Sequence, residues 1–223
     1  MLREQFEAFK TKYGKSYESA EEEEVRFGIF KETVERVARK NKEMDPVFGI
    51  TKFADLTQHE FRERYLTYRP SGVDSSRPVR QPKTTSVSSS YDWRDNGAIT
   101  AVKDQGYCGS CWAFSTTETI ESAWAIAGNT LTEFSVAQIV QCDSNDAGCN
   151  GGDPPLAYEY VESAGGLATE DDYPYSKSLY NGRTGQCSSD FTVSGGAISG
   201  YEYATPACTS RKCNNQDRKS TPT

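Results

Sequence analysis

Residues 105–112 read Gln-Gly-Tyr-Cys-Gly-Ser-Cys-Trp, a glycine-rich turn with two cysteines that leads directly into a helical pattern. Apolar and small side chains then recur at helical spacing until Gly128-Asn129, which predicts the end of that helix. Cys111 therefore falls in the first turn, where the positive end of the helix dipole favours a thiolate. Because the thiolate is the nucleophilic form of cysteine, Cys111 is a candidate nucleophile, and Cys108 is better placed for a disulfide.

The same pair of cysteines is also compatible with a zinc knuckle or a redox-active disulfide, since Cys-x-x-Cys occurs in both classes. A zinc site needs a second such pair, which the spacing of Cys142, Cys149 and Cys187 does not supply. A thioredoxin-like site needs a βαβ unit around the motif. We therefore expect no metal and no cofactor, while the motif alone leaves both alternatives open.

The chain has 223 residues, of which 35% are hydrophobic, and this suits one large domain or two small ones. It has no apolar run of about 18 residues, so we expect no membrane span, and no secretory segment is visible at its start. Residues 1–90 carry 17 Lys and Arg against 15 Asp and Glu, whereas residues 91–223 carry 8 against 17. The acidic larger part disfavours a nucleic acid as partner, and the two parts could instead pack on each other.

The cysteines are unevenly distributed, because all seven lie from Cys108 onward. This indicates that only the second part is cross-linked, and it points to an oxidising compartment. The absence of an export signal contradicts that compartment. Our interpretation is that the start of the gene is missing from this sequence.

The N-terminal part predicts a long amphipathic helix, in which Phe27, Phe30, Val34 and Val37 share one face. Acidic residues open this helix and basic residues close it, as the helix dipole favours. Asp45-Pro46 is its expected stop.

Beyond this helix, residues 70–90 are rich in Ser, Pro, Arg and Thr, which is typical of an exposed linker. Two further helices are predicted after the one that begins near Cys111. Ser135 and Gln138 predict a capping box at the start of the first. The second is expected from Pro154-Pro155 to Gly165-Gly166.

Residues 108–112 match Cys-Gly-[Ser/Ala]-Cys-[Trp/Tyr], and on this motif the chain resembles the papain family of cysteine proteases. The resemblance continues, in the family's order and spacing, through Asp92-Trp93-Arg94, Val102-Lys103-Asp104-Gln105, Gly148-Cys149-Asn150-Gly151-Gly152 and Tyr173-Pro174-Tyr175. It implies an α+β fold class, with a helical inhibitory prodomain followed by the helical (left) half of the papain-like fold. The β-barrel half would be mostly absent, apart from a first strand around Phe191 to Tyr203.

The resemblance also implies the catalytic roles. Cys111 would be the nucleophile, and its backbone N–H would form an oxyanion hole together with the Gln105 side chain. The family pairs the nucleophile with a His, oriented by an Asn, about 130 to 150 residues further on, and fewer residues than that follow Cys111. The single histidine, His59, lies in a polar stretch and is assigned no catalytic role. We therefore expect a truncated sequence with little or no protease activity.

Substrate binding is implied for four consecutive residues. Gly151 and Gly152 would offer open backbone to a substrate strand, because no side chain intervenes. Asp153 and Pro154 would border the pocket for the substrate's second residue. The family often has an aromatic where this chain has Asp153, so the side-chain preference of the pocket stays open.

The resemblance also implies the disulfide pairing, which spacing alone does not choose, since four cysteines allow three pairings. The implied pairs are Cys108–Cys149 and Cys142–Cys187. Cys208 and Cys213 would close a small local loop, and Cys111 would remain a free thiol.

The N-terminal part resembles the inhibitory propeptide of the same family. Thr33, Val37 and Thr51 depart from its two interspersed motifs. The matching positions are Glu22, Arg26, Phe30, Asn41, Gly49, Phe53 and Asp55.

From this we predict a cysteine-type endopeptidase that is made as an autoinhibited zymogen. Its partners would be a peptide or protein substrate and its own propeptide as an intramolecular inhibitor. The alternative is a propeptide-like inhibitor or binding protein that acts on related cysteine proteases through residues 1–70. A lysosomal, vacuolar or extracellular location follows from the resemblance only.

The expected organisation has four parts. Residues 1–69 would be the inhibitory propeptide domain, and residues 70–90 the linker and processing region, with cleavage around residues 86–90. Residues 91–207 would form a partial papain-like peptidase domain. Residues 208–223 would be a polar tail, either disordered or a product of truncation.

Overall fold

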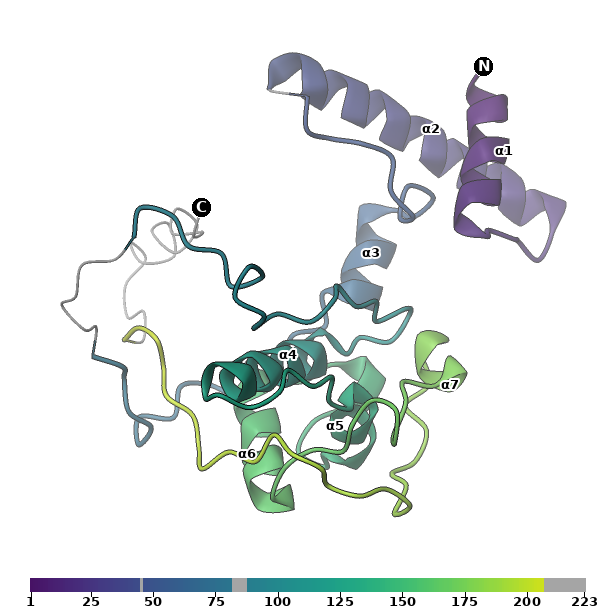
Figure 1. The fold of residues 1–223 in the computed structure, drawn as a ribbon. Coiled ribbons are helices and arrows are strands. Elements are labelled where there is room, and N and C mark those ends of the chain that lie inside the picture. Colours follow the sequence, from purple (N-terminus) through teal and green to yellow (C-terminus); the bar gives the residue numbers. More distant parts are fainter. Residues whose placement is uncertain (45, 82–87, 207–223) are drawn as a thin grey trace. The chain divides into compact units, whose positions relative to one another are not determined.

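The computed structural model describes residues 1–44, 46–81 and 88–206 (Figure 1). The chain divides into two compact units, Met1–Leu66 and a second unit that begins at Thr67. The expected Cys208–Cys213 loop and the polar tail lie outside the described residues, and so do residues 82–87 of the expected linker and processing region.

The first unit is helical, as its sequence pattern predicts. It contains α1 (Leu2–Tyr13), α2 (Ala20–Glu43) and α3 (Gln58–Tyr65). The Ser19 side chain accepts a hydrogen bond from the Glu22 N–H at the start of α2, and acidic residues fill the first turn. The long amphipathic helix is thus confirmed, and it ends two residues before the expected stop.

Aromatic side chains form the core of this unit. Phe6, Phe9 and Phe30 are almost fully buried, and their ring centroids lie 5.0 to 6.0 Å apart. Phe30 comes from the apolar face of α2, and Phe6 and Phe9 come from α1. Because a fully buried phenylalanine contributes roughly 1.5 to 3 kcal/mol, these rings account for much of the packing of α1 on α2.

The second unit is built around α4 (Cys111–Ile126), which packs against α5 (Val136–Cys142) and α6 (Pro154–Ala164) (Figure 1). A short 3₁₀ helix, η1 (Gly148–Asn150), and a single helical turn, α7 (Lys177–Tyr180), complete it. The core side chains that are fully buried include Trp112, Phe134, Ile139, Val161, Leu167 and Leu179. The three helices predicted here from caps and periodicity are confirmed.

Two disulfides tie this helical core to its loops. Cys108–Cys149 joins the turn before α4 to η1, and Cys142–Cys187 joins the end of α5 to the loop after α7. These are the pairs that the resemblance implied. Each closes a loop of more than 40 residues, which in the chain-entropy model stabilises the fold by about 4 kcal/mol.

Two local predictions need correction. Ser135 does accept a hydrogen bond from the Gln138 N–H, but the Gln138 side chain does not complete a capping box. It bonds instead to the Ala168 N–H and the Gly166 carbonyl, because those buried backbone groups have to be paired.

The strand expected around Phe191 to Tyr203 is also wrong. In the described chain this stretch makes only isolated bridges, from Gly195 to Leu167 and from Tyr203 to Val79. A strand needs a continuous ladder of hydrogen bonds with a neighbour, and the described residues offer these segments only single pairings. The described architecture is therefore a helical first unit followed by a mainly helical second one. No described helix has both the length and the apolar character needed to cross a membrane.

Glu121 on α4 is a fully buried charge in the second unit. Its carboxylate accepts hydrogen bonds from Lys103 Nζ at 2.9 Å, Thr100 Oγ1 at 2.6 Å and the Phe134 N–H at 2.9 Å. Both oxygens are thus paired, and the interaction joins the loop before the cysteine turn to α4 and to the loop before α5.

We expect Glu121→Ala to lower the free energy of unfolding by about 3 to 5 kcal/mol, because it leaves Lys103 without its partner in a mostly buried place. Urea unfolding followed by circular dichroism measures this loss. Glu118→Ala, one turn earlier and only half-buried, is the control and should cost no more than about 1 kcal/mol. Equal losses in the two variants would contradict the role given to Glu121.

Candidate active site

Cys111 is the first residue of α4, and it is partly exposed. It is the one free cysteine among the described residues. The preceding residue, Ser110, is fully buried, and its hydroxyl lies 2.8 Å from the Tyr175 hydroxyl, which donates to the Gln105 carbonyl at 3.0 Å. On the other side, Trp112 Nε1 donates to the Gly148 carbonyl at 3.2 Å. These bonds fix the thiol at the N-terminus of α4.

Gln105 and Cys111 line the same open hollow, of about 620 Å³, along one side of α4. Gln105 Nε2 donates one hydrogen bond, of 2.7 Å, to the Cys108 carbonyl, and its second hydrogen is left for another acceptor. The structure thus brings the expected nucleophile and the expected oxyanion donor together. The hollow continues along α4 past Phe114 and Glu118.

A strip of glycines lies beside Cys111 and is covered by the segment that begins the second unit. A Cβ on Gly151 would lie 2.0 Å from the Thr67 carbonyl oxygen, and a Cβ on Gly109 would lie 2.6 Å from the Thr67 side chain. Gly151 also has a φ of +111°, which favours glycine. A side chain at either position would displace the covering segment, so the glycines are needed for this close approach.

The covering segment is residues 67–71, which sequence reasoning did not place in the site. Thr67 Oγ1 donates to the Gly109 carbonyl at 2.9 Å and lies 4.0 Å from Cys111 Sγ. The Arg69 N–H donates to the Gly152 carbonyl at 3.1 Å. Pairing of a peptide backbone with an open glycine backbone is how extended peptides bind to many proteins.

Asp153 and Pro154 mark the start of α6, next to this strip. Pro154 is the first helical residue, where its missing N–H has no cost. Asp153 is 1% exposed, and its carboxylate accepts hydrogen bonds from Ser71. The expected position of both residues beside Gly152 therefore matches the structure, whereas their role in substrate preference stays a proposal.

Two further acids, Asp143 and Asp146, lie behind Asp153. Asp146 Oδ1 accepts a hydrogen bond from the Asp153 N–H at 3.0 Å. Burial, together with the neighbouring charge of Asp143, raises the pKa of Asp146 to about 7, and burial also raises the pKa of Asp143. Like charges in a buried place cannot both ionise cheaply, so this pair holds a proton near neutral pH. The described residues contain no group of three or more His, Cys, Asp or Glu side chains arranged to hold a metal ion.

The propeptide positions form a polar network in the first unit. Arg26 donates to Glu60 Oε1 at 2.7 Å and to the Asp55 carbonyl at 3.2 Å, and it lies 3.6 Å from Glu22. The buried Asp55 carboxylate accepts from Lys15 and Tyr17, each at 3.0 Å. The α2 helix is thereby fixed to the segment before α3.

Glu60 was missed by sequence reasoning, although Thr57-x-x-Glu60 is the signature of a capping box and the structure forms one at the start of α3. Burial alone would raise the pKa of Glu60, but hydrogen bonds from Thr57 and Arg26 outweigh it and lower the pKa to about 2. The next residue back, His59, is exposed on α3.

The other propeptide positions act on the backbone and the core. Asn41 bonds both the N–H and the carbonyl of Phe48, at 2.9 and 2.8 Å, and so turns the chain after α2. Phe53 packs edge-on against Phe61 and Tyr65. Gly49 has open space where a Cβ would lie, and nothing in the structure explains its glycine.

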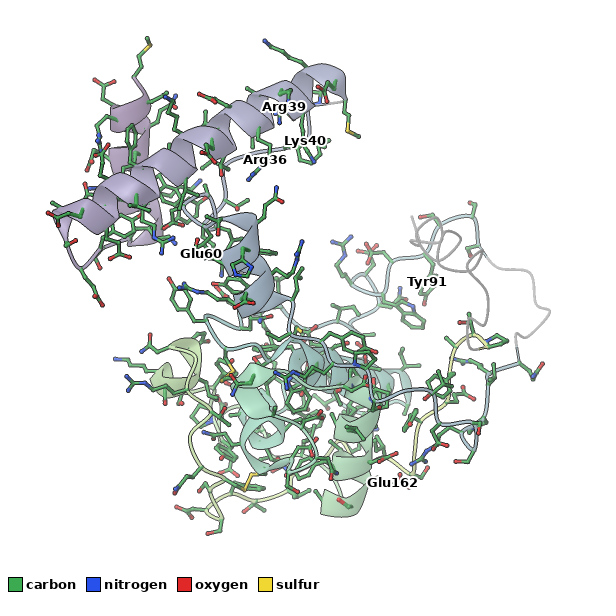
Figure 2. All side chains as sticks on the ribbon, turned by 180° about the vertical axis from the view of Figure 1, so that it is seen from behind. Arg36, Arg39, Lys40, Glu60, Tyr91 and Glu162 are labelled. Atoms are coloured by element: carbon green, nitrogen blue, oxygen red, sulfur yellow. A yellow bond between two sulfur atoms is a disulfide. The ribbon has the colours of Figure 1, made fainter. Side chains whose placement is uncertain are left out.

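The basic residues near the end of α2 gather on its C-terminal half, where Arg36, Arg39 and Lys40 are marked in Figure 2. Arg36 and Lys40 line a groove of about 460 Å³ together with Phe48 and Phe61. This groove belongs to the first unit alone.

Comparison with known proteins gives two family matches. Residues 87–221 match the papain family of cysteine proteases, and residues 6–61 match the cathepsin propeptide inhibitor domain. Among curated relatives, cysteine proteinase 15A of Pisum sativum is 40% identical over 213 residues, covering 90% of this chain and 57% of that protein. A cysteine proteinase of Trypanosoma brucei brucei is 41% identical and covers 90% of this chain and 45% of its own length. The chain thus spans roughly half the length of these relatives.

Solved structures give the same result. Recombinant stem bromelain precursor has a TM-score of 0.76 at 32% identity, over 90% of this chain and 64% of that one. A digestive procathepsin L2 from the larval midgut of Tenebrio molitor has a TM-score of 0.77 at 31% identity, over 91% of this chain and 67% of that one.

The protonated Asp143–Asp146 pair predicts a pH-dependent stability. An acid whose folded pKa is raised stabilises the fold fully below its ordinary value of 3.8, and the contribution is lost as pH rises to about 7. We expect Asp146→Asn to remove this loss, so that its unfolding midpoint in urea changes less than that of the unaltered chain between about pH 4 and about pH 8. Asp171→Asn, at an exposed acid, is the control. An unchanged pH profile in Asp146→Asn would contradict the shared proton.

The Arg26 network predicts the opposite pH dependence in the first unit. Arg26→Met should cost about 2 kcal/mol, since it leaves charged and backbone acceptors unpaired. Hydrogen exchange of α1 and α2 amides measures it, with the exposed Arg39→Met as the control. Because the pKa of Glu60 is lowered, the stabilisation is present above about pH 4.3, its ordinary value, and is lost as pH falls towards 2. Exchange that is equally fast in both variants would rule the network out as a support of the unit.

Proposed function

Because the chain belongs to the papain family of cysteine proteases and carries a cathepsin propeptide inhibitor domain, we propose that it is the precursor form of a cysteine endopeptidase with Cys111 as nucleophile. The observation that carries this proposal is the position of the free thiol. Cys111 begins a helix, lies beside an open glycine backbone and shares a hollow with Gln105. A nucleophile, a strand-binding edge and an oxyanion donor are the parts that peptide acyl transfer needs.

In the proposed reaction, the Cys111 thiolate adds to the carbonyl carbon of a peptide bond, and the carbonyl electron pair moves onto the oxygen. The Cys111 N–H and Gln105 Nε2 would donate to that oxygen, and losing one such donor typically lowers the rate about 100-fold or more. Collapse of this intermediate breaks the C–N bond, and the amine leaves with a proton. Water then adds to the thioester carbonyl and releases the acid and the thiolate.

The proton transfers need a base, which the family supplies as an imidazole. The single histidine of this sequence is His59, on the exposed side of α3 in the first unit. We therefore assign the proton transfers to no residue of this chain. Our proposal for the sequence as it stands is a competent nucleophile half with little peptide hydrolysis of its own.

The segment from Thr67 to Ser71 would act as the inhibitory part of the precursor. It lies on the glycine strip, and its Thr67 hydroxyl is 4.0 Å from Cys111 Sγ. Because it occupies the backbone edge on which a substrate strand would lie, a substrate cannot bind there at the same time. The segment would thus block the cleft.

A second candidate function is inhibition of related cysteine proteases. It is favoured by the inhibitor domain, which matches over residues 6–61. An inhibitor would slow a related protease in trans at matched concentrations, whereas an enzyme precursor would be labelled at its own nucleophile.

The two disulfides support an oxidising compartment, outside the cytosol. One of the similar structures is a digestive proteinase of larval midgut, and this is compatible with a lysosomal, vacuolar or extracellular site for the present chain.

Alkylation by iodoacetamide tests the nucleophile. Arg69→Pro removes the N–H that holds the covering segment to Gly152 and should expose Cys111. At about pH 6, Cys111 in this variant should react at least ten times faster than in the urea-unfolded chain, because reactive cysteines are typically found at helix N-termini. Peptide mapping by mass spectrometry assigns the label, and Cys111→Ser is the blank. Equal rates in the folded and unfolded chains would overturn the proposal.

A further inference from the structure

Asp153 is a buried carboxylate that the covering segment itself pairs. The Ser71 N–H and the Ser71 hydroxyl both donate to its Oδ2, at 2.6 and 2.7 Å. The Tyr68 hydroxyl lies close enough that burial, and then the Asp153 charge, raise its pKa. All these donors come from residues 67–71, and none of them comes from the helical core.

Outside residues 67–71, the described part of the second unit offers the Asp153 carboxylate no further hydrogen bond or ion pair. Asp153 Oδ1 is buried without a hydrogen-bond partner among the described residues, and so are Asp143 Oδ2 and Asp146 Oδ2 behind it. The described ion pairs of the second unit use Arg77, Arg80, Arg94 and Lys103, and none of them includes Asp153. A buried carboxylate without donors is costly, so the bound peptide has to provide them.

Ser71 also fixes the register of the segment. Thr67 contacts Gly109, Arg69 pairs with Gly152 and Ser71 reaches Asp153, so alternate residues face the cleft as in an extended strand. A slip by one residue would bring Pro70 or Gly72 opposite Asp153. Neither has a donor in its side chain, and proline also lacks the N–H. Of these three registers, only the observed one places a side-chain donor on the carboxylate, and it also puts Thr67 beside Cys111.

We propose that Asp153 is a specificity-determining residue of the cleft: a buried carboxylate subsite that takes a hydrogen-bond-donating side chain from the peptide seated there, which in this chain is Ser71. This inference rests on the proposed function, since it assigns a preference to the same cleft. A hydroxyl or a cationic side chain satisfies the subsite. An aliphatic side chain leaves the carboxylate unpaired, and an acidic one adds a like charge.

The full-length chain tests the subsite through its own segment. The readout is the rate at which iodoacetamide labels Cys111, because Thr67 of the segment covers one side of the partly exposed thiol and slows the approach of the reagent. A hydrogen bond to a charged group is worth roughly a factor of ten or more in an equilibrium. Ser71→Ala should therefore speed labelling about tenfold. Ser71→Leu and Ser71→Asp should speed it at least as much, whereas Ser71→Thr and Ser71→Lys should stay close to the unaltered chain. Ser75→Ala, in the same exposed stretch, is the matched control.

Asp153→Asn supplies a double-mutant cycle. The amide weakens the acceptor, so Ser71→Ala in that background should add little to the labelling rate. Ser71 is exposed, so its variants test the idea even if Asp153→Asn folds poorly.

The subsite idea is overturned if Ser71→Ala labels no faster than Ser75→Ala while Arg69→Pro is labelled rapidly. It is also overturned if Ser71→Leu and Ser71→Asp stay as slow as Ser71→Lys. Failure of the proposed function has a different signature, because Arg69→Pro would then react no faster than the unfolded chain. If Arg69→Pro and the unaltered chain are labelled equally fast, the segment does not cover Cys111 and the subsite assignment fails with it.

Discussion

The second unit depends on one constraint: the first turn of α4 must hold a free thiol at its surface while the residues around it are fully buried. The Cys108–Cys149 disulfide and the bond from Trp112 to the Gly148 carbonyl fix the turn to η1. The Ser110–Tyr175–Gln105 connection fixes it to the loop before α7. Because Gly151 and Gly152 directly follow η1, the same contacts that hold the nucleophile also set its distance from the peptide-binding edge.

The sequence could predict the elements whose causes are local. The start of α4, the capping serine of α5 and the prolines of α6 are all visible as short patterns, since helix ends are decided by side chains within one turn. Cys111 and Gln105 could be placed in the site because they lie in one continuous motif. The disulfide pairs needed the family resemblance, since spacing cannot choose among the pairings of four cysteines.

The remaining features depend on contacts between distant residues, which no local pattern encodes. The Gln138 side chain does not form the expected capping box with Ser135. It pairs instead with the buried Gly166 carbonyl and the buried Ala168 N–H. The capping box of Glu60 has a local signature, Thr57-x-x-Glu60, but the hydrogen bond of Glu60 with Arg26, a residue on another helix, has none. Residues 67–71 have the composition of an ordinary exposed linker. Their place on the cleft is visible only from their contacts with Gly109, Gly151 and Asp153.

Glu121 and Asp153, two of the buried acids of the second unit, differ in where their hydrogen-bond donors come from. Glu121 accepts hydrogen bonds from two side chains and one backbone N–H, all of them in the second unit. Its carboxylate is therefore fully paired once the unit has folded. Asp153 receives its donors from a segment that crosses the surface, and one of its oxygens stays unpaired. A carboxylate buried only for stability would be expected to resemble Glu121, because an unpaired charge costs more than an apolar side chain in its place. Asp153 instead keeps a buried carboxylate whose donors come only from the bound peptide. A peptide without such donors leaves this carboxylate unpaired and binds less tightly, and the difference in affinity lets the site discriminate between peptides.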